Sequence, residues 1–599
     1  MKPFRLTFIL CLLALATTAQ KSIQVNDPIF KDLYTAFQRV LKIWHVAGFA
    51  VAVVEKNKVV YANGFGYRDL EAKLPVTQNT LFAIGSCSKA FTSTLIGKLQ
   101  QDGKLDIDKP VNNYLPSLKF FNDAMNNSIT LRDMMSHQTG LPRHDLSWYF
   151  FNSPSTDSLL QRVQFMEPTF GVRHKWQYNN FMFAAQGDVV EKLTGSSWEE
   201  NVKEKIFKPL GMSRSVLNIP DMQKMDDIAV GYGLKKDTII KKLDYYHING
   251  MAPAGSINSS VVDMAKWVTA WINNGNFEGK EIIPASYRDQ AISAQSVINA
   301  ALPSKEQPEL YFANYGFGWF LSSYKGHYRV EHGGNIDGFS ASTCFFPSDS
   351  VGIIVLTNQN GSVVPSIIRN LLSDKVLKLK YYDWCDYMKK TADKNKLSEG
   401  KKEKPSALKL NAPTHELSEY VGDYNNPGYG TLKIRLIKDS LQAKTFNNTL
   451  WLRHNNYDIF DILNPTEEID TAETPQLKFQ FQMDFSGEIS GFIAPLEQGI
   501  KPITFTKTSI AKPITAQEMQ KYVGEYELSG VRAKVYLKDQ TLYVLVLGQP
   551  EYETVPIGSD KFSLKILSGY YVQFSPSGDE NITEITFIQP NGSFKAKKK

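Results

Sequence analysis

Three short motifs, spread along the chain, constrain its fold more than any other feature. They are Ser-x-x-Lys at 86–89, Tyr-x-Asn at 178–180 and His-Gly-Gly at 332–334. Ser-x-x-Lys is a weak signal by itself, and it recurs without chemical context at 322–325 and 406–409. The three motifs together suit one acyl-transfer site, so the fold has to bring all three segments to one place.

The first motif opens an expected helix at 86–101, where apolar residues recur at helical spacing. Residues three apart share a helix face, so Ser86 and Lys89 should lie within reach of each other. A buried Lys89 loses its proton more easily and can act as a base towards the Ser86 hydroxyl. We therefore interpret Ser86 as the nucleophile. The competing interpretation is a helix-capping serine beside a solvated lysine.

The second motif begins a predicted helix at 178–193. The phenol of Tyr178 can carry a proton between Ser86 and a leaving group, and the sequence leaves open whether Lys89 or Tyr178 is the resting base. The amide of Asn180 can hold the substrate or orient Lys89. The competing interpretation is a packed aromatic ring followed by a capping asparagine.

The third motif ends a predicted strand and leads into Asn335. Gly333 and Gly334 allow a substrate to approach the strand closely. The backbone N–H of Asn335, together with that of Ser86, is expected to form an oxyanion hole. If His332 contacts the substrate, activity should change where an unperturbed imidazole titrates, at roughly pH 6 to 7. The alternative is that His332 is a packed strand residue.

Residues 20–390 form the first expected domain, which mixes helices and strands. Two β-rich runs at 49–54 and 59–64 flank a polar turn, which predicts a hairpin. Further strands follow as a meander within 315–358, and one long helix at 364–389 is expected to close the domain. This order predicts an α/β (α+β) fold, in which an antiparallel sheet is flanked by helices and carries a helical subdomain.

An internal repeat organises the rest of the chain. After a Lys- and Glu-rich linker at 391–411, the sequence at 419–424 matches that at 521–526. Alternating strand patterns follow each copy. We therefore predict two all-β antiparallel barrels, at 412–510 and 511–599.

The N-terminus has the pattern of a secretory signal peptide at 1–19. Lys2 and Arg5 precede an apolar core at 6–16, which is too short to span a bilayer. We expect export across the inner membrane, to a periplasmic or extracellular location. No later apolar run reaches the length of about 20 residues that a spanning helix needs, so no stable membrane span is expected after cleavage.

The bulk composition of the 599 residues excludes some partners. The net charge of +6 is small and dispersed, which argues against a nucleic-acid partner. The nine His include no pair at metal-ligand spacing, so no metal and no other cofactor is expected. Three sparse cysteines after the signal peptide argue against a disulfide framework: Cys87, Cys344 and Cys385.

The motif residues resemble those of the serine β-lactamase-like hydrolase superfamily, which contains class C β-lactamases, D-Ala-D-Ala carboxypeptidases, D-aminopeptidases and esterases. The resemblance covers about residues 28–385 and includes two further stretches, at 129–142 and 253–256. It implies a β-lactamase/transpeptidase-like fold and catalysis by the first two motifs. The predicted barrels are similar to the lipocalin-like barrels of D-aminopeptidase relatives, where barrel segments help to shape the active-site entrance.

One departure bears on the substrate. The β-lactamase branch usually carries Lys-Thr-Gly where this chain has His332-Gly333-Gly334. A penicillin carboxylate therefore loses a permanently charged partner. The resemblance implies an exported serine hydrolase that forms an acyl-enzyme on small peptides, amides or esters, peptidoglycan-derived peptides among them. The alternatives are a penicillin-binding or cell-wall-sensing module with little turnover, or a weak β-lactamase.

Overall fold

The computed structural model describes most of the chain after its first 29 residues. The signal-peptide prediction and part of the expected linker lie outside the described residues. The described ranges are 30–299, 311–400, 411–445, 449–463, 477–485, 487–508, 514–528, 530–558, 560–565, 567, 570–576, 581–589 and 591–599.

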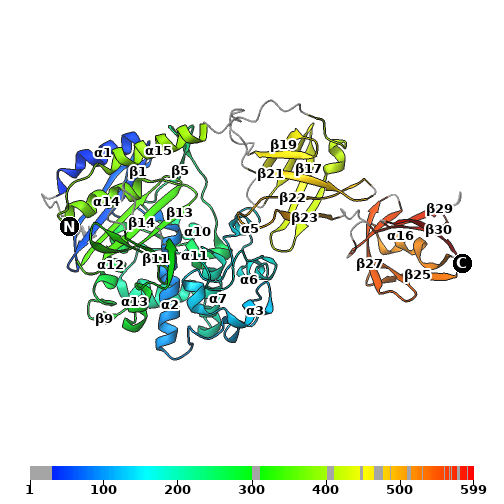
Figure 1. The fold of residues 1–599 in the computed structure, drawn as a ribbon, viewed down its shortest axis with the longest axis horizontal. Helices are drawn as coiled ribbons and strands as arrows, with labels where there is room; N and C mark the ends of the chain where they lie inside the picture. Colours follow the sequence, from blue (N-terminus) through cyan, green and yellow to red (C-terminus); the bar gives the residue numbers. More distant parts are fainter. Residues whose placement is uncertain are drawn as a thin grey trace, which may run out of the picture.

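A 9-stranded antiparallel sheet forms the centre of the N-terminal domain (Figure 1). The hairpin predicted near the start of the domain is β1–β2, and the predicted meander corresponds to β12 to β15, so both predictions are confirmed. The strand order is β10 (Ser296–Asn299), β11 (Ala313–Tyr315), β12 (Phe320–Tyr324), β13 (His327–Ile336), β14 (Phe339–Phe346), β15 (Val351–Thr357), β1 (Gly48–Glu55), β2 (Lys58–Asp69) and β3 (Leu74–Pro75).

Helices cover both faces of this sheet, and short ladders tie the loops together. β4 (Phe82–Ala83) pairs with β7 (Asn258–Ser259), β5 (Tyr232–Lys235) with β6 (Ile239–Lys242), and β8 (Asn276–Phe277) with β9 (Lys280–Glu281). The α-helices are α1 (Leu33–Ile43), α2 (Lys89–Gln101), α3 (Asp123–Ser128), α4 (Leu131–Met135), α5 (Asp145–Tyr149), α6 (Thr156–Leu160), α7 (Phe181–Thr194), α8 (Trp198–Val202), α9 (Lys208–Leu210), α10 (Ile219–Met222), α11 (Ala252–Gly255), α12 (Val261–Ile272), α13 (Ala285–Ala291), α14 (Val364–Val376) and α15 (Trp384–Gly400).

The central strands are apolar on both faces because both faces are buried. In β1, Phe49 and Val51 join the core that contains α1 and α14, whereas Ala50 and Ala52 join the core that contains α2 and α12. Successive side chains of a strand point to opposite faces, which explains this alternation. The three sequence motifs lie on the side of the larger core, where the helical subdomain packs.

The end of the domain differs from the prediction of one closing helix at 364–389. The structure breaks this segment into α14 and α15. Asp374, near the end of α14, accepts hydrogen bonds from Lys325 and from the indole of Trp384, the first residue of α15. Lys378 has a left-handed φ of 55°, which ends α14 and lets the chain turn back. α15 then extends into the range that the sequence predicted as linker.

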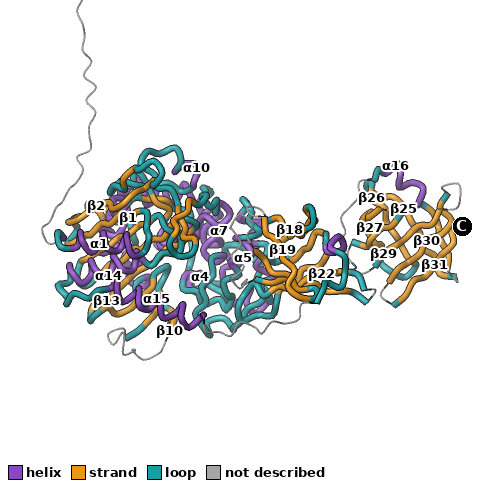
Figure 2. Tube along the Cα trace, turned by 90° about the horizontal axis from the view of Figure 1, so that it is seen from above, coloured by secondary structure: helices purple, strands orange, loops and turns teal. Residues whose placement is uncertain are grey.

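Two closed antiparallel barrels follow, and they confirm the predicted fold class (Figure 2). No helix among the described residues has both the length and the apolar character that crossing a membrane requires. Barrel 1 contains β16 (Gly422–Asn426), β17 (Gly430–Ile437), β18 (Ser440–Lys444), β19 (Thr449–Asn456), β20 (Ile459–Leu463), β21 (Lys478–Met483), β22 (Ile489–Ala494) and β23 (Ile503–Thr508). Barrel 2 follows α16 (Ala516–Met519) and contains β24 (Gly524–Leu528), β25 (Val531–Lys538), β26 (Thr541–Val546), β27 (Glu551–Gly558), β28 (Lys561–Leu564), β29 (Tyr571–Pro576), β30 (Ile582–Gln589) and β31 (Gly592–Lys598).

Candidate active site

The structure brings the first two motifs together at the Ser86 hydroxyl. Ser86 lies in a 3-10 turn, Gly85–Ser88, which leads directly into α2. The Nζ atom of Lys89 lies 2.9 Å from Ser86 Oγ, and the hydroxyl of Tyr178 lies 2.8 Å from the same oxygen. Lys89 Nζ also donates to the carbonyl of Ala254 at 2.8 Å. The Ser86 oxygen therefore has two partners that can exchange protons with it.

The surroundings of Lys89 favour its neutral form. Lys89 is fully buried, and burial lowers the pKa of its ammonium group well below the ordinary value. The nearby Arg143 charge lowers this pKa further, while Asp145 opposes the shift. A neutral amine can accept the Ser86 proton, so the surroundings of Lys89 suit a general base.

The tyrosine is held in its protonated form. Burial raises the pKa of Tyr178, although its contact with Ser86 and the charge of Arg143 act in the opposite direction. The guanidinium carbon of Arg143 lies 4.5 Å from the centroid of the Tyr178 ring. A protonated phenol is an acid rather than a base at neutral pH, so this geometry suits Tyr178 to proton donation.

Strand β13 lies directly against the turn that contains Ser86. A Cβ atom on Gly334 would lie 1.8 Å from the carbonyl oxygen of Ile84 and 3.2 Å from the amide nitrogen of Ser86. A Cβ atom on Gly85, whose φ is +50°, would lie 2.8 Å from the amide nitrogen of Asn335. The close approach therefore requires glycine at both positions. It places the backbone of Asn335 beside that of Ser86, as an oxyanion hole needs.

His332 and Gly333 occupy different surroundings. The His332 side chain is only 2% exposed, and its Nε2 atom lies 2.9 Å from the Tyr315 hydroxyl. Burial lowers the pKa of His332 to about 3, and the charge of Lys89 acts in the same direction. The imidazole is therefore not the unperturbed group on which the expected change at pH 6 to 7 was based. Gly333 is exposed and has room for a side chain.

Asn180 is fixed by a charged pair that the sequence analysis did not single out. Its Nδ2 atom donates to Asp145 at 2.8 Å, and Arg143 Nε donates to the same carboxylate at 2.6 Å. Trp148 Nε1 also donates to Asp145, at 2.9 Å. Asn180 thus shares its carboxylate partner with Arg143, whose guanidinium lies over the Tyr178 ring.

The N-terminal domain matches a known protein family. A family model described as Beta-lactamase matches residues 35–378, which is more than half of the chain. The chain belongs to the Beta-lactamase family. A second model, for a domain of unknown function (DUF3471), matches residues 409–507, the segment that forms barrel 1.

Individual relatives place this Beta-lactamase family member near hydrolases. Unguisins hydrolase ungD' of Aspergillus campestris is 29% identical over 436 residues, which cover 68% of this chain and 78% of that protein. Protein flp of Staphylococcus aureus is 23% identical and covers 59% of this chain and 67% of its own length. The octameric penicillin-binding protein homologue from Pyrococcus abyssi superposes with a TM-score of 0.54 and 19% identity, over 86% of this chain and 98% of that one. The superposition supports the fold.

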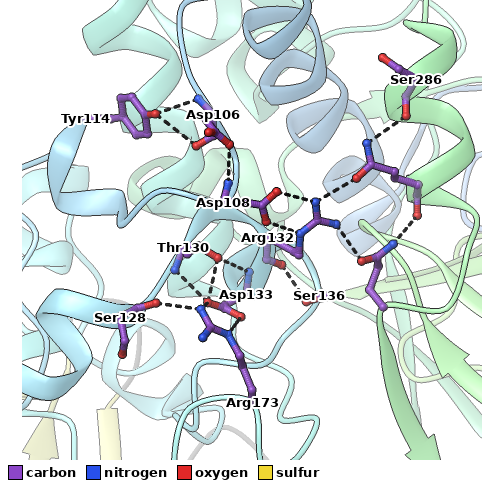
Figure 3. A network of polar contacts seen from close by, with 12 residues as sticks. Asp106, Asp108, Tyr114, Ser128, Thr130, Arg132, Asp133, Ser136, Arg173 and Ser286 are labelled. Carbon is purple, nitrogen blue, oxygen red and sulfur yellow. Dashed lines mark hydrogen bonds and ion pairs between the residues drawn. The ribbon is translucent and has the colours of Figure 1, made fainter.

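The stretch at 129–142 serves the Beta-lactamase family site as a scaffold. Arg173 donates to both oxygens of Asp133 at 2.8 and 2.7 Å, and Asp133 in turn caps α4 through Thr130 (Figure 3). On the other side, Arg132 forms a two-point contact with Asp108 (Figure 3). These contacts fix the position of α4. The chain that leaves α4 contains His137 and Arg143, which both contact the Tyr178 ring.

His137, in the chain that follows α4, holds the residues on both sides of Tyr178 by hydrogen bonds. The amide of Gln177 donates to the carbonyl of His137 at 2.8 Å, and the amide of Asn179 donates to Nδ1 of His137 at 3.2 Å. The rings of His137 and Tyr178 lie 4.3 Å apart. His137 is fully buried, and burial lowers the pKa of its imidazole well below the ordinary value. A neutral His137 ring therefore packs against the Tyr178 ring and helps to position it.

A cavity of about 310 Å³ opens beside Ser86. Two predicted residues, Asn180 and Asn335, line it together with Ser86. Its wall also contains charged and aromatic residues that sequence reasoning missed: Arg143, Asp145, Trp148, Tyr149, Tyr246 and Asp337. Arg143 and Asp145 directly follow the stretch at 129–142, and this adjacency was a usable signal. Among the described residues, no three His, Cys, Asp or Glu side chains gather in a way that suits a metal ion.

Proposed function

We propose that this Beta-lactamase family member is a serine hydrolase that forms an acyl-enzyme on small peptides, amides or esters. The observation that carries the proposal is the convergence of Lys89 Nζ and the Tyr178 hydroxyl on Ser86 Oγ, at 2.9 and 2.8 Å. A serine hydroxyl becomes a useful nucleophile when a base takes its proton, and the lowered pKa of the Lys89 ammonium group makes Lys89 that base.

The reaction follows from these positions. Ser86 Oγ attacks the substrate carbonyl while its proton moves to Lys89. The N–H groups of Ser86 and Asn335 stabilise the negative oxygen of the tetrahedral intermediate. Tyr178 protonates the leaving group as the carbon–leaving-group bond breaks and is reprotonated from Lys89. Water then attacks the acyl-enzyme with Lys89 again as base, which releases the acid and restores Ser86.

Export belongs to the proposal as well. The basic and apolar pattern of residues 1–19 supports secretion, and small peptides or esters outside the cytoplasm, peptidoglycan-derived peptides included, are the proposed substrates. The printed name of the Aspergillus relative, a hydrolase, supports the reaction class. The buried, neutral His332 argues against efficient β-lactamase activity, because it offers no permanent charge to a penicillin carboxylate.

Two substitutions and a matched control test the mechanism. Ser86→Ala should abolish both hydrolysis of p-nitrophenyl butyrate and labelling by a fluorophosphonate probe. Lys89→Ala should lower kcat/KM by at least about 100-fold, the usual scale for loss of a general base. Ser322 stands in the second Ser-x-x-Lys sequence, where its hydroxyl accepts a hydrogen bond from Arg329. Ser322→Ala should therefore remain active.

The same assay separates an enzyme from a binding module. Continued turnover after the first acylation supports a hydrolase. A single stoichiometric burst of nitrophenol with no further release would instead favour the penicillin-binding or sensing alternative. Retained activity in Ser86→Ala would refute both.

A further inference from the structure

A carboxylate stands in the cavity next to the proposed oxyanion hole. Asp337 follows the last residue of β13 and begins the turn into β14. It lines the same cavity as Ser86 and Asn335. Asp337 is two residues beyond Asn335, on the order of 7 Å along an extended chain. This distance suits a group that lies a few bonds from a carbonyl held at Ser86.

The charges that line the cavity do not balance. Arg143 and Asp145 form an ion pair at 2.6 Å and neutralise each other. Asp337 accepts hydrogen bonds from the Tyr149 hydroxyl at 2.8 and 3.1 Å. Within the described part of the chain, no lysine, arginine or histidine forms an ion pair with it. A half-buried carboxylate without a cation is costly, and burial accordingly raises the pKa of Asp337.

Three aromatic side chains, which we call the aromatic wall, line the same cavity as this carboxylate. Tyr149 stacks on Tyr246 with ring centroids 4.9 Å apart, and Trp148 meets Tyr149 edge-on at 5.9 Å. All three side chains line the cavity. The Tyr246 hydroxyl donates to the backbone carbonyls of Trp148 and Tyr149, which fixes the rings in place. Electron-rich ring faces beside a carboxylate are the combination that attracts an organic ammonium group.

We propose that Asp337 and this aromatic wall bind a protonated amino group on the acyl portion of the substrate. The site would then prefer amino-acid amides, esters and peptides with a free amino group over N-acylated ones. The ammonium group supplies a cationic partner for Asp337, which forms no ion pair among the described residues and accepts its hydrogen bonds from the Tyr149 hydroxyl. This inference rests on the proposed serine hydrolase function. It states that the enzyme recognises the acyl side of the scissile bond through its amino group.

Matched substrates test the inference. The D and L forms of alanine p-nitroanilide are compared with their N-acetyl counterparts, and the ratio of kcat/KM values is the readout. The wild-type enzyme should favour the free amine by at least about tenfold. Asp337→Asn should lower this ratio by at least about tenfold, because removal of one partner of a close charge pair is strongly unfavourable. Asp337→Glu should recover part of the preference.

A control variant removes the same charge elsewhere. Asp289 is exposed and pairs with Arg288 outside the cavity, so Asp289→Asn should leave the ratio unchanged. Equal turnover of free and N-acetylated anilides by the wild type, or a ratio that Asp337→Asn does not move, would overturn the inference. Ser86-dependent ester hydrolysis would still stand in either case, so the two failures are distinguishable.

Protection from labelling gives a second readout that does not require turnover of an anilide. Alaninamide should slow fluorophosphonate labelling of Ser86 more than propionamide, which lacks the amino group. This difference should disappear in Asp337→Asn. Equal protection by both amides in the wild type would contradict an ammonium site.

Discussion

The two barrels share a strand plan but differ in what completes their cores. The core cluster of barrel 2 is built from residues 514–596 of that barrel. The core cluster of barrel 1 includes Phe151 from the N-terminal domain, and Leu146 and Phe150 pack against it. Barrel 1 accordingly lies between the N-terminal domain and barrel 2 (Figure 1). Barrel 1 therefore packs on the segment that carries the cavity wall, whereas the described core of barrel 2 contains residues of that barrel alone.

The turn between β16 and β17 shows one part of this difference. Between β16 and β17 of barrel 1, the carbonyl of Gly428 accepts a hydrogen bond from the Ser147 hydroxyl at 2.6 Å, and the Tyr429 hydroxyl lies 2.9 Å from the His144 ring. The corresponding turn of barrel 2 contains Gly530, where an added Cβ would meet open space. The repeated barrels therefore share their internal fold, whereas the contacts of barrel 1 with the N-terminal domain come from its own loop and strand residues, Glu497 among them.

The largest expected effect comes from removal of the barrels in turn. A chain that ends at residue 510 keeps barrel 1 and should hydrolyse p-nitrophenyl butyrate within about twofold of the full chain. A chain that ends at Gly400 exposes Phe151 and its neighbours and leaves α5 without support. We expect its kcat/KM to fall at least about tenfold, because a displacement of about 1 Å in a positioning group can cost about 100-fold.

Equal kinetics and equal melting of the N-terminal domain in both shortened chains would contradict a supporting role for barrel 1. A drop that occurs already at residue 510 would assign the role to barrel 2 instead. In either case the comparison between the barrels would need a different physical basis.

A matched pair of core substitutions sharpens the comparison. Phe151 is 8% exposed and Phe574, in barrel 2, is 1% exposed. Phe151→Ala and Phe574→Ala should each destabilise the barrel into whose core the ring packs by about 3 kcal/mol or more, as large-to-small changes in a core do. Only Phe151→Ala should also raise KM or lower kcat, because it alone loosens α5. Calorimetry and ester kinetics of both variants check this, and altered kinetics in Phe574→Ala would contradict it.

Much of the fold was predictable because its signals are local. The hairpin β1–β2, the late meander and the repeated barrels each follow from strand patterns and turn residues over short windows. The division of the predicted closing helix into α14 and α15 was not predictable, because it depends on a tertiary contact. Asp374 is held by Lys325, a residue far away in sequence, and by Trp384. Helical periodicity alone contains no information about such a partner.

The candidate site also contains residues that local sequence predicts and residues that it does not. Ser86 and Lys89 are placed by helix geometry, so their proximity could be predicted from spacing alone. Asp337 could not be found in this manner, since its chemistry depends on Tyr149 from a distant segment. The protonation of His332 also depends on burial, which one strand pattern does not reveal.

The smallest expected effect concerns a tyrosine–aspartate hydrogen bond that both barrels contain. In barrel 1 the hydroxyl of Tyr420 donates to Asp458, and in barrel 2 that of Tyr522 donates to Asp560. Burial alone would raise the pKa of Asp458, but the hydrogen bonds from Tyr420 and Thr414 outweigh it and hold the pKa below its ordinary value. The bond from Tyr522 lowers the pKa of Asp560 in the same direction.

A carboxylate whose pKa is lower in the folded state stabilises the fold above its unfolded pKa of about 3.9, and this contribution is lost as the pH falls through the folded value. Tyr420→Phe and Tyr522→Phe should each remove about 1 kcal/mol at pH 7, a modest amount because both carboxylates are partly exposed. At about pH 3 each variant should lose less stability than at pH 7, because protonation of the carboxylate begins to remove the contact below its unfolded pKa. Thermal melts at both pH values measure this difference. An equal loss at pH 7 and pH 3 would mean that the two hydroxyls act through packing rather than through the carboxylates.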